Sequence, residues 1–178
     1  MKWLRFILVA AALFFAGIDL PSIAAPNQLV PKGLGDTITL PGLLSYQAPA
    51  GWNQVETNAS PQACGPISNG VVPDITFNPG NYGPLSKLAD TFELTYYDDH
   101  SVSLKQVDQK SFVTSAGVKA VRVHAINASS GITQYSYVFL SSDGQQLELA
   151  CACATADAAV YLPVFDASMK SVKILKPE

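Results

Sequence analysis

Two strand-like segments near the C-terminus constrain the fold of this chain most strongly. Residues 132–140 and 145–154 are rich in β-branched, aromatic and aliphatic side chains. They flank Ser-Ser-Asp-Gly at 141–144, which is a strong local signal for a β-hairpin. Because side chains alternate along a strand, every second residue from Leu147 to Cys153 falls on one face. The chain is therefore predicted to contain an antiparallel hairpin with one apolar face.

Shorter strands are predicted before and after this hairpin. Residues 118–126 alternate between apolar and polar side chains, which is typical of a half-exposed strand with Arg122 and His124 facing solvent. Pro41-Gly42 divides another β-rich segment into two short pieces. The further strands are predicted at 37–47, 75–77, 112–114 and 172–175.

Two helices are predicted to flank the strands. Pro84 suits a first helical turn, and apolar residues follow it at helical spacing, at Leu85, Leu88, Phe92 and Tyr96. Residues 156–170 are predicted to form a second helix, with Thr155 or Asp157 as its cap and Pro163 either kinking it or starting a new segment. We expect a helix to cover the aromatic face of the strand at 132–140. The class is therefore α+β, with a mostly antiparallel sheet flanked by helices.

The N-terminus has the three parts of a secretory signal. Lys2 and Arg5 precede an uncharged apolar run at 6–18, and Ser22 and Ala24 supply the small residues that follow it. The run of 13 residues is short for a membrane span, which needs about 20. Cleavage after Ala24 is predicted, and the alternative is an uncleaved N-terminal anchor. The protein is accordingly expected to be exported, either to a periplasm or to the medium.

The chain that remains after cleavage is expected to be one acidic domain. Residues 25–36 would form a flexible lead-in, and 37–178 a single domain. Removing two basic residues and one acidic residue with the signal leaves 9 basic and 13 acidic residues, a net charge of −4. Nucleic acids and anionic membranes are recognised largely by Arg and Lys, so neither is a predicted partner. No stable membrane span is expected after cleavage.

Three cysteines raise the question of a disulfide. Cys64 lies in a loop rich in Pro and Gly, while Cys151 and Cys153 share one strand. Residues two apart on a strand have Cα atoms close to 7 Å apart, which is near the limit for a disulfide. Because exported proteins often contain disulfides, Cys64 is predicted to pair with Cys151 or Cys153, leaving the third cysteine as a small buried residue. The alternatives are a redox dithiol or a soft-metal site at Cys151 and Cys153.

Three short motifs, in this order, resemble the Mog1/PsbP-like family of α/β/α sandwiches. Residues 45–52 (SYQAPAGW) are similar to the family's strand that ends in P-x-G-W. Residues 117–123 (GVKAVRV) are similar to its G-x-x-A strand opening, and 165–172 (FDASMKSV) to its closing F-x-x-I-x-x-S-F. The resemblance covers residues 37–175 and implies the sandwich fold. It carries no common catalytic residues, so it implies no active site.

The chemistry in the sequence favours binding over catalysis. No G-x-S-x-G, H-E-x-x-H or phosphate-binding glycine loop is present, and His100 and His124 are the only histidines. We therefore predict a non-enzymatic protein without a cofactor or metal, which binds a protein partner or an envelope complex. Its predicted partner or pocket surface includes Trp52, Tyr97 and His124. The alternative is a small-ligand or soft-metal-binding periplasmic protein that uses the region of Cys151 and Cys153.

The export prediction is checked by the intact mass of protein purified from its export compartment. We expect the denatured mass to match residues 25–178, lowered by about two hydrogens if one disulfide has formed. A mass that includes residues 1–24 would contradict cleavage after Ala24.

Overall fold

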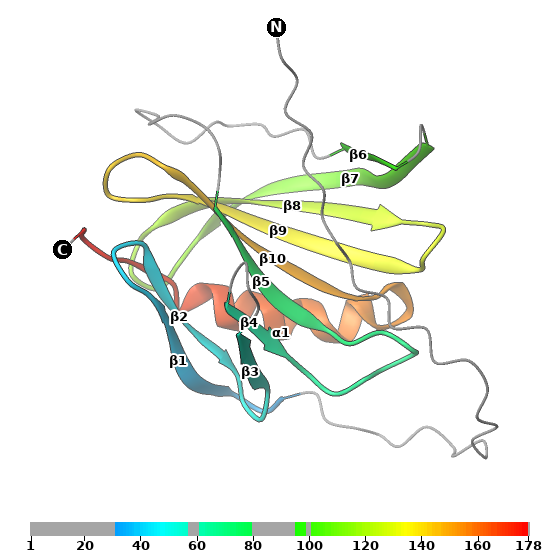
Figure 1. The fold of residues 1–178 in the computed structure, drawn as a ribbon, viewed down its shortest axis with the longest axis horizontal. Coiled ribbons are helices and arrows are strands. Elements are labelled where there is room, and N and C mark those ends of the chain that lie inside the picture. The colour runs from blue at the N-terminus through cyan, green and yellow to red at the C-terminus, as the bar shows by residue number, and fades with distance from the viewer. Residues whose placement is uncertain (1–30, 57–60, 80–94, 99–100, 178) are drawn as a thin grey trace, which may run out of the picture.

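The computed structural model describes residues 31–56, 61–79, 95–98 and 101–177. Most of this chain forms an antiparallel sheet with the strand order β3-β4-β5-β10-β9-β8-β7-β6 (Figure 1). Its strands are β3 (Asn53–Glu56), β4 (Pro61–Cys64), β5 (Asp74–Pro79), β6 (Thr95–Asp98), β7 (Ser101–Val113), β8 (Lys119–Asn127), β9 (Ile132–Leu140) and β10 (Gln146–Ala154).

A second, smaller antiparallel sheet has the strand order β1-β2-β11. Its strands are β1 (Leu34–Leu40), β2 (Leu44–Pro49) and β11 (Lys173–Ile174). The turn between β1 and β2 contains Gly42 with a φ of 70°, a left-handed conformation that glycine adopts without steric cost. In this sheet, a strand from near the start and a strand from near the end of the described chain lie on either side of β2.

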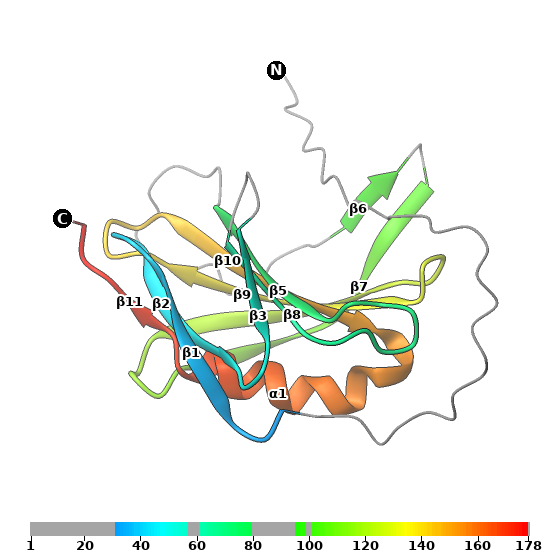
Figure 2. The ribbon, with the colours of Figure 1, turned by 60° about the horizontal axis from the view of Figure 1, so that its bottom comes forward.

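One α-helix, α1 (Ala158–Lys170), lies across one face of the large sheet, with the small sheet at one end (Figure 2). A 3₁₀ turn (Thr155–Asp157) leads into it. Its buried side chains are Tyr161, Val164, Phe165, Ser168 and Met169. The helix is continuous through Pro163, whose ring is exposed, so Pro163 starts no new segment. Asp157 is the N-cap residue, but its side chain makes no capping hydrogen bond.

The core lies between α1, the small sheet and the facing side of the large sheet. Leu149 and Cys151 on β10 and Tyr137 and Phe139 on β9 have no exposed surface. They meet Phe165 and Met169 of α1 within one buried cluster. The predicted apolar face of the C-terminal hairpin and the predicted helix over β9 are therefore confirmed.

Several predicted elements agree with the structure. The strands at 132–140 and 145–154 match β9 and β10, the segment at 75–77 lies in β5, and Pro41-Gly42 separates β1 from β2. The strand predicted to start at residue 37 begins earlier, at Leu34. The coarse class, a mixed α+β fold with antiparallel sheets, is confirmed.

Two predictions need correction or fall outside the described chain. The helix predicted from Pro84 lies mostly outside the described residues, but its last predicted member, Tyr96, is in strand β6. The prediction that Arg122 and His124 face solvent is wrong, because their side chains are only 12% and 18% exposed. They lie on the face that α1 covers, where Arg122 meets an acidic residue of the helix. Within the described ranges, no helix is long and apolar enough to cross a membrane.

Phe165 is expected to be the most sensitive position of α1. Phe165→Ala should lower the free energy of unfolding by about 3–5 kcal/mol, because the ring has no exposed surface and its removal leaves a cavity in the core. Denaturant unfolding followed by circular dichroism measures this change. Val160→Ala, at a position of the same helix that is 45% exposed, is the control and should change stability by less than about 1 kcal/mol. Equal losses in the two variants would contradict this account of the core.

Candidate functional site

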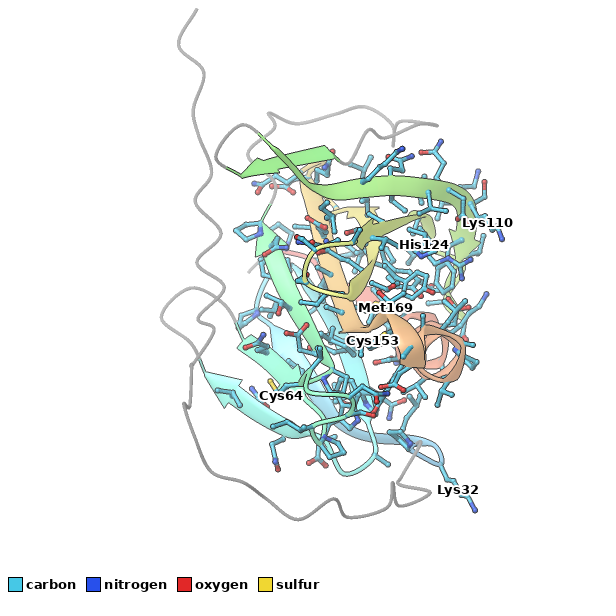
Figure 3. All side chains as sticks on the ribbon, turned by 90° about the vertical axis from the view of Figure 1, so that its right-hand side faces the viewer. Lys32, Cys64, Lys110, His124, Cys153 and Met169 are labelled. Carbon is cyan, nitrogen blue, oxygen red and sulfur yellow. The ribbon has the colours of Figure 1, made fainter. Side chains whose placement is uncertain are left out.

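The three cysteines are free thiols, so the structure does not contain the predicted disulfide. Cys64 pairs in register with Asp74, which in turn pairs with Ala152. Because neighbours across a sheet share a face, Cys64 lies on the opposite face from Cys151 and Cys153. Figure 3 shows Cys64 well separated from Cys153.

Cys151 and Cys153 lie under α1 with no exposed surface. Burial raises the pKa of the Cys151 thiol well above its ordinary range and that of Cys153 to about 12. Both therefore stay protonated at neutral pH, whereas a nucleophilic or metal-binding cysteine acts as the thiolate. His124 shares their face of the sheet, yet no group of three or more His, Cys, Asp or Glu side chains in the described ranges is placed to hold a metal ion.

Trp52 and His124, two residues of the predicted surface, lie at opposite ends of an aromatic row under α1. Trp52 meets Phe165 edge-on with ring centroids 6.1 Å apart, and Phe165 meets Tyr135 at 6.3 Å. Tyr135 stacks on His124 with centroids 4.7 Å apart. The two predicted residues are thus linked through the core and do not form one surface. Tyr97 lies in β6, and its side chain is outside the described part.

Beside this row, a partly buried polar group joins the large sheet to α1. Arg122 on β8 donates to both carboxylate oxygens of Asp166 on α1, at 3.0 Å each. The hydroxyl of Tyr137 donates to the same carboxylate at 2.7 Å. Charge-assisted hydrogen bonds of this kind are stronger than neutral ones, so the group fixes the rotation of α1 against β8 and β9. These hydrogen bonds join α1 to the sheet, while Nε of Arg122 is buried without a partner.

His124 has a weaker acidic neighbour. Its Nδ1 lies 3.7 Å from Oδ2 of Asp108 on β7, which is longer than a normal hydrogen bond. Its Nε2 is buried and has no hydrogen-bond partner. In the described part of the chain, the imidazole stacks on Tyr135 and lies beside Asp108, neither of which is a Ser or Cys. The Asp108–His124 pair therefore has the geometry of a structural contact and does not match that of a dyad that activates a nucleophile.

The opposite face of the large sheet carries two carboxyl groups that are largely removed from solvent. Burial raises the pKa of Asp74 to about 6, although hydrogen bonds from Gln62 and the backbone of Ala152 act to lower it. Burial likewise raises the pKa of Glu148, whose hydrogen bonds with Ser136 and Asn78 act in the lowering direction. Oε1 of Glu148 is buried without a partner. These groups make the stability of the sheet depend on pH.

The structure contains an ordered hairpin that the sequence interpretation missed. In residues 65–73, here called the 65–73 hairpin, the amide of Gly65 donates to the carbonyl of Pro73 at 2.8 Å. Ser68 and Val71 exchange two backbone hydrogen bonds, of 2.9 and 3.0 Å. Asn69 and Gly70 between them have φ values of 48° and 76°, which is the pattern of a type I′ turn. The dipeptide Asn69-Gly70 is a sequence signal for this type of turn.

The 65–73 hairpin is also fixed to the rest of the protein. Asn69 Nδ2 donates to Oδ1 of Asp157 at 2.6 Å, which ties the turn to the start of α1. A Cβ atom at Gly65 would lie 2.7 Å from the Trp52 ring, so the indole packs directly on this backbone. Even so, Ile67 and Val72 remain 72% and 42% exposed. The hairpin thus presents apolar side chains from a rigid backbone.

The fold and these surfaces define an α+β protein with two antiparallel sheets, a helix that locks onto one of them, and an exposed apolar hairpin. No family model matches the chain, and none of the curated proteins matches it.

The raised pKa of Asp74 predicts a specific pH dependence. The pKa of Asp74 in the folded protein, about 6, is higher than its ordinary value of 3.8, so protonation of this carboxyl stabilises the folded state. The contribution to the free energy of unfolding is fully present below about pH 4. This contribution, up to about 3 kcal/mol, is lost as the pH rises through 6. The difference in unfolding free energy between wild type and Asp74→Asn should therefore change over pH 4–7.

The contrasting control is Asp143→Asn. A hydrogen bond from Ser141 lowers the pKa of the exposed Asp143. Its small contribution to the free energy of unfolding is therefore present at neutral pH and is lost only as the pH falls into the acidic range, the opposite direction to that of Asp74. Parallel stability curves for wild type and Asp74→Asn across pH 4–7 would contradict the burial of the Asp74 carboxyl.

Proposed function

We propose that this chain is an exported, non-enzymatic protein that binds a protein partner through the 65–73 hairpin. The observation that carries the proposal is the exposure of Ile67 and Val72 on a hairpin that is already rigid. Exposed apolar side chains that gather on one feature typically mark an interaction surface. A rigid loop also loses little conformational entropy on binding, so more of its contact energy appears as affinity.

The charges near the hairpin favour a particular kind of partner. Asp157 holds the turn and Asp74 follows the hairpin directly, while none of residues 65–73 is charged. The described cations lie on other segments, at Lys32, Lys105, Lys110, Lys119, Arg122, Lys170, Lys173 and Lys176. We therefore expect the partner to present an apolar pocket to this uncharged hairpin.

The titratable side chains beneath α1 support a non-enzymatic role. Arg122, Asp166 and Tyr137 hydrogen-bond to one another, and His124 stacks on Tyr135. These contacts hold α1 on the large sheet. Polar side chains that lie between a helix and a sheet are expected to make structural contacts of this kind.

The Mog1/PsbP-like type remains our proposal for the class. What supports it is the order of the three sequence motifs together with the antiparallel sheet that carries α1 on one face. Residues 45–52 lie on β2 and the turn after it, 117–123 lie at the start of β8, and 165–172 lie at the end of α1. Each motif therefore stands at an element boundary, as a packing motif does.

The second candidate, a small-ligand or soft-metal site at Cys151 and Cys153, has less support. Both thiols are fully buried, and burial raises the pKa of each. A ligand could reach them only if α1 moved away from the sheet.

The test is photocrosslinking in the intact envelope, with a photoreactive residue at position 67. We expect one discrete crosslinked protein, and we expect Ile67→Asp combined with Val72→Asp to abolish its co-purification with the chain. Because both side chains are exposed, the double variant should keep the unfolding midpoint of the wild type.

The matched control is the exposed apolar residue Val107 on β7, which is 55% exposed. A photoreactive residue at position 107 should not capture the same protein, and Val107→Asp should leave co-purification unchanged. Equal capture from positions 67 and 107, or an unaffected double variant, would refute the hairpin as the binding surface.

A further inference from the structure

A depression of about 350 Å³ lies at the C-terminal end of α1, at the other end of the helix from the 65–73 hairpin. Its lining residues come from the small sheet, the turn between β7 and β8, and the end of α1. Its lining residues are Leu34, Gln47, Ser115, Ala116, Ala167, Lys170, Ser171 and Lys173. Small-molecule sites commonly have volumes from about 300 Å³ upward, so the depression is large enough for a small ligand.

The charge of this depression is positive and unbalanced. Lys170 and Lys173 line it, and no carboxylate does. Within the described ranges, the ion pairs are Arg122–Asp166 and Asp108–His124, so neither lysine has a carboxylate partner there. Two ammonium groups without a counter-charge favour an anionic ligand.

Lys170 is held in position. Its Nζ donates to the carbonyl of Val113 and lies 4.7 Å from the centroid of the Phe112 ring. An ammonium group has three donors, so at least one N–H remains for a ligand. The backbone around it is also fixed, because the amide of Ser115 donates to the carbonyl of Lys170 at 2.8 Å.

The lining beside the lysines is stabilised by hydrogen bonds between β2 and the C-terminal end of α1. The amide of Gln47 donates to Oγ of Ser171 at 2.7 Å, and that hydroxyl donates to the carbonyl of Ser168 at 2.6 Å. The hydroxyl of Ser168 donates to the carbonyl of Gln47. The depression therefore exists before any ligand binds, which lowers the cost of binding.

Three of the lining residues are apolar. Leu34 is 37% exposed, and the methyl groups of Ala116 and Ala167 are at the surface as well. We propose that this depression binds a small ligand with an apolar body and a single carboxylate, whose charge meets Lys170 and Lys173 while its apolar part contacts Leu34. Such a group occurs both on free aliphatic acids and at the C-terminal residue of a peptide.

This site does not depend on the proposed function. The 13 residues of α1 span about 20 Å, so the depression and the 65–73 hairpin are separate surfaces. Loss of one does not imply loss of the other.

The test is a titration of the ¹⁵N-labelled mature chain followed by amide chemical shifts. Octanoate should shift the amides of Ser115, Ala116, Lys170 and Lys173 in a saturable manner. Octanol, which lacks the charge, and sulfate, which lacks the apolar body, should each bind at least about tenfold more weakly. N-acetyl-leucine distinguishes the sources, since tighter binding of this compound than of octanoate identifies a peptide terminus.

Lys173→Gln should weaken octanoate binding about fivefold or more, and Lys170→Gln combined with Lys173→Gln at least about tenfold. Because Lys170 also bonds the backbone of Val113, the single variant at Lys173 keeps the test valid if the double variant unfolds. Lys105→Gln combined with Lys110→Gln removes the same charge elsewhere and should leave the affinity unchanged. The proposal is overturned if octanoate shifts none of these amides, if octanol or sulfate matches octanoate, or if the Lys105/Lys110 control loses as much affinity as the Lys170/Lys173 variant.

Discussion

Phe165 makes the contacts on which the rest of the structure depends. Its ring meets Trp52, Tyr135 and Tyr161, which come from the segment after β2, from β9 and from α1. Large aromatic side chains bury the most apolar area per residue. One ring that joins three segments therefore contributes more to stability than any single pair of residues opposite each other on neighbouring strands. The ion pair of Arg122 and Asp166 lies at the next position along the helix and sets its rotation. Apolar packing therefore provides the stability of α1 on the sheet, and the buried charges provide its orientation.

With the helix fixed in this way, its two ends have different chemistry. The N-cap residue, Asp157, holds the 65–73 hairpin, which exposes the apolar side chains of Ile67 and Val72. The last turn is bonded to Gln47 of β2 and presents Lys170 toward a depression that has no acidic lining. A lysine at a helix C-terminus also interacts favourably with the helix dipole, so the structural and binding contributions of Lys170 act in the same direction.

Much of the fold could be predicted from the sequence because it rests on local periodicity. The alternation in β9 and β10 and the Ser-Ser-Asp-Gly turn determine a hairpin without reference to the rest of the chain. The orientation of β8 could not be predicted in this way, because Val123 on one face and Arg122 on the other are both buried. A polar residue on a strand predicts a solvent-facing position only when no other part of the chain covers it. Arg122 is covered by α1, where its partner Asp166 lies 44 residues further along the chain. The cysteines show the same limit, since strand register placed Cys64 on the face away from Cys151.

The surfaces proposed for binding were the hardest to predict, for a related reason. The sequence drew attention to Trp52, His124 and the cysteine pair, which are chemically distinctive residues, and the structure uses them in or beside the core. Ile67 and Lys173 are ordinary residue types whose significance comes only from where the backbone places them. The distance between them follows from the length of α1, so a ligand in the lysine-lined depression would not touch a partner on the hairpin. Any influence of one on the other would have to pass through the helix and therefore through Phe165, whose packing allows little displacement. The arrangement thus favours two independent binding events on one rigid frame over an allosteric pair.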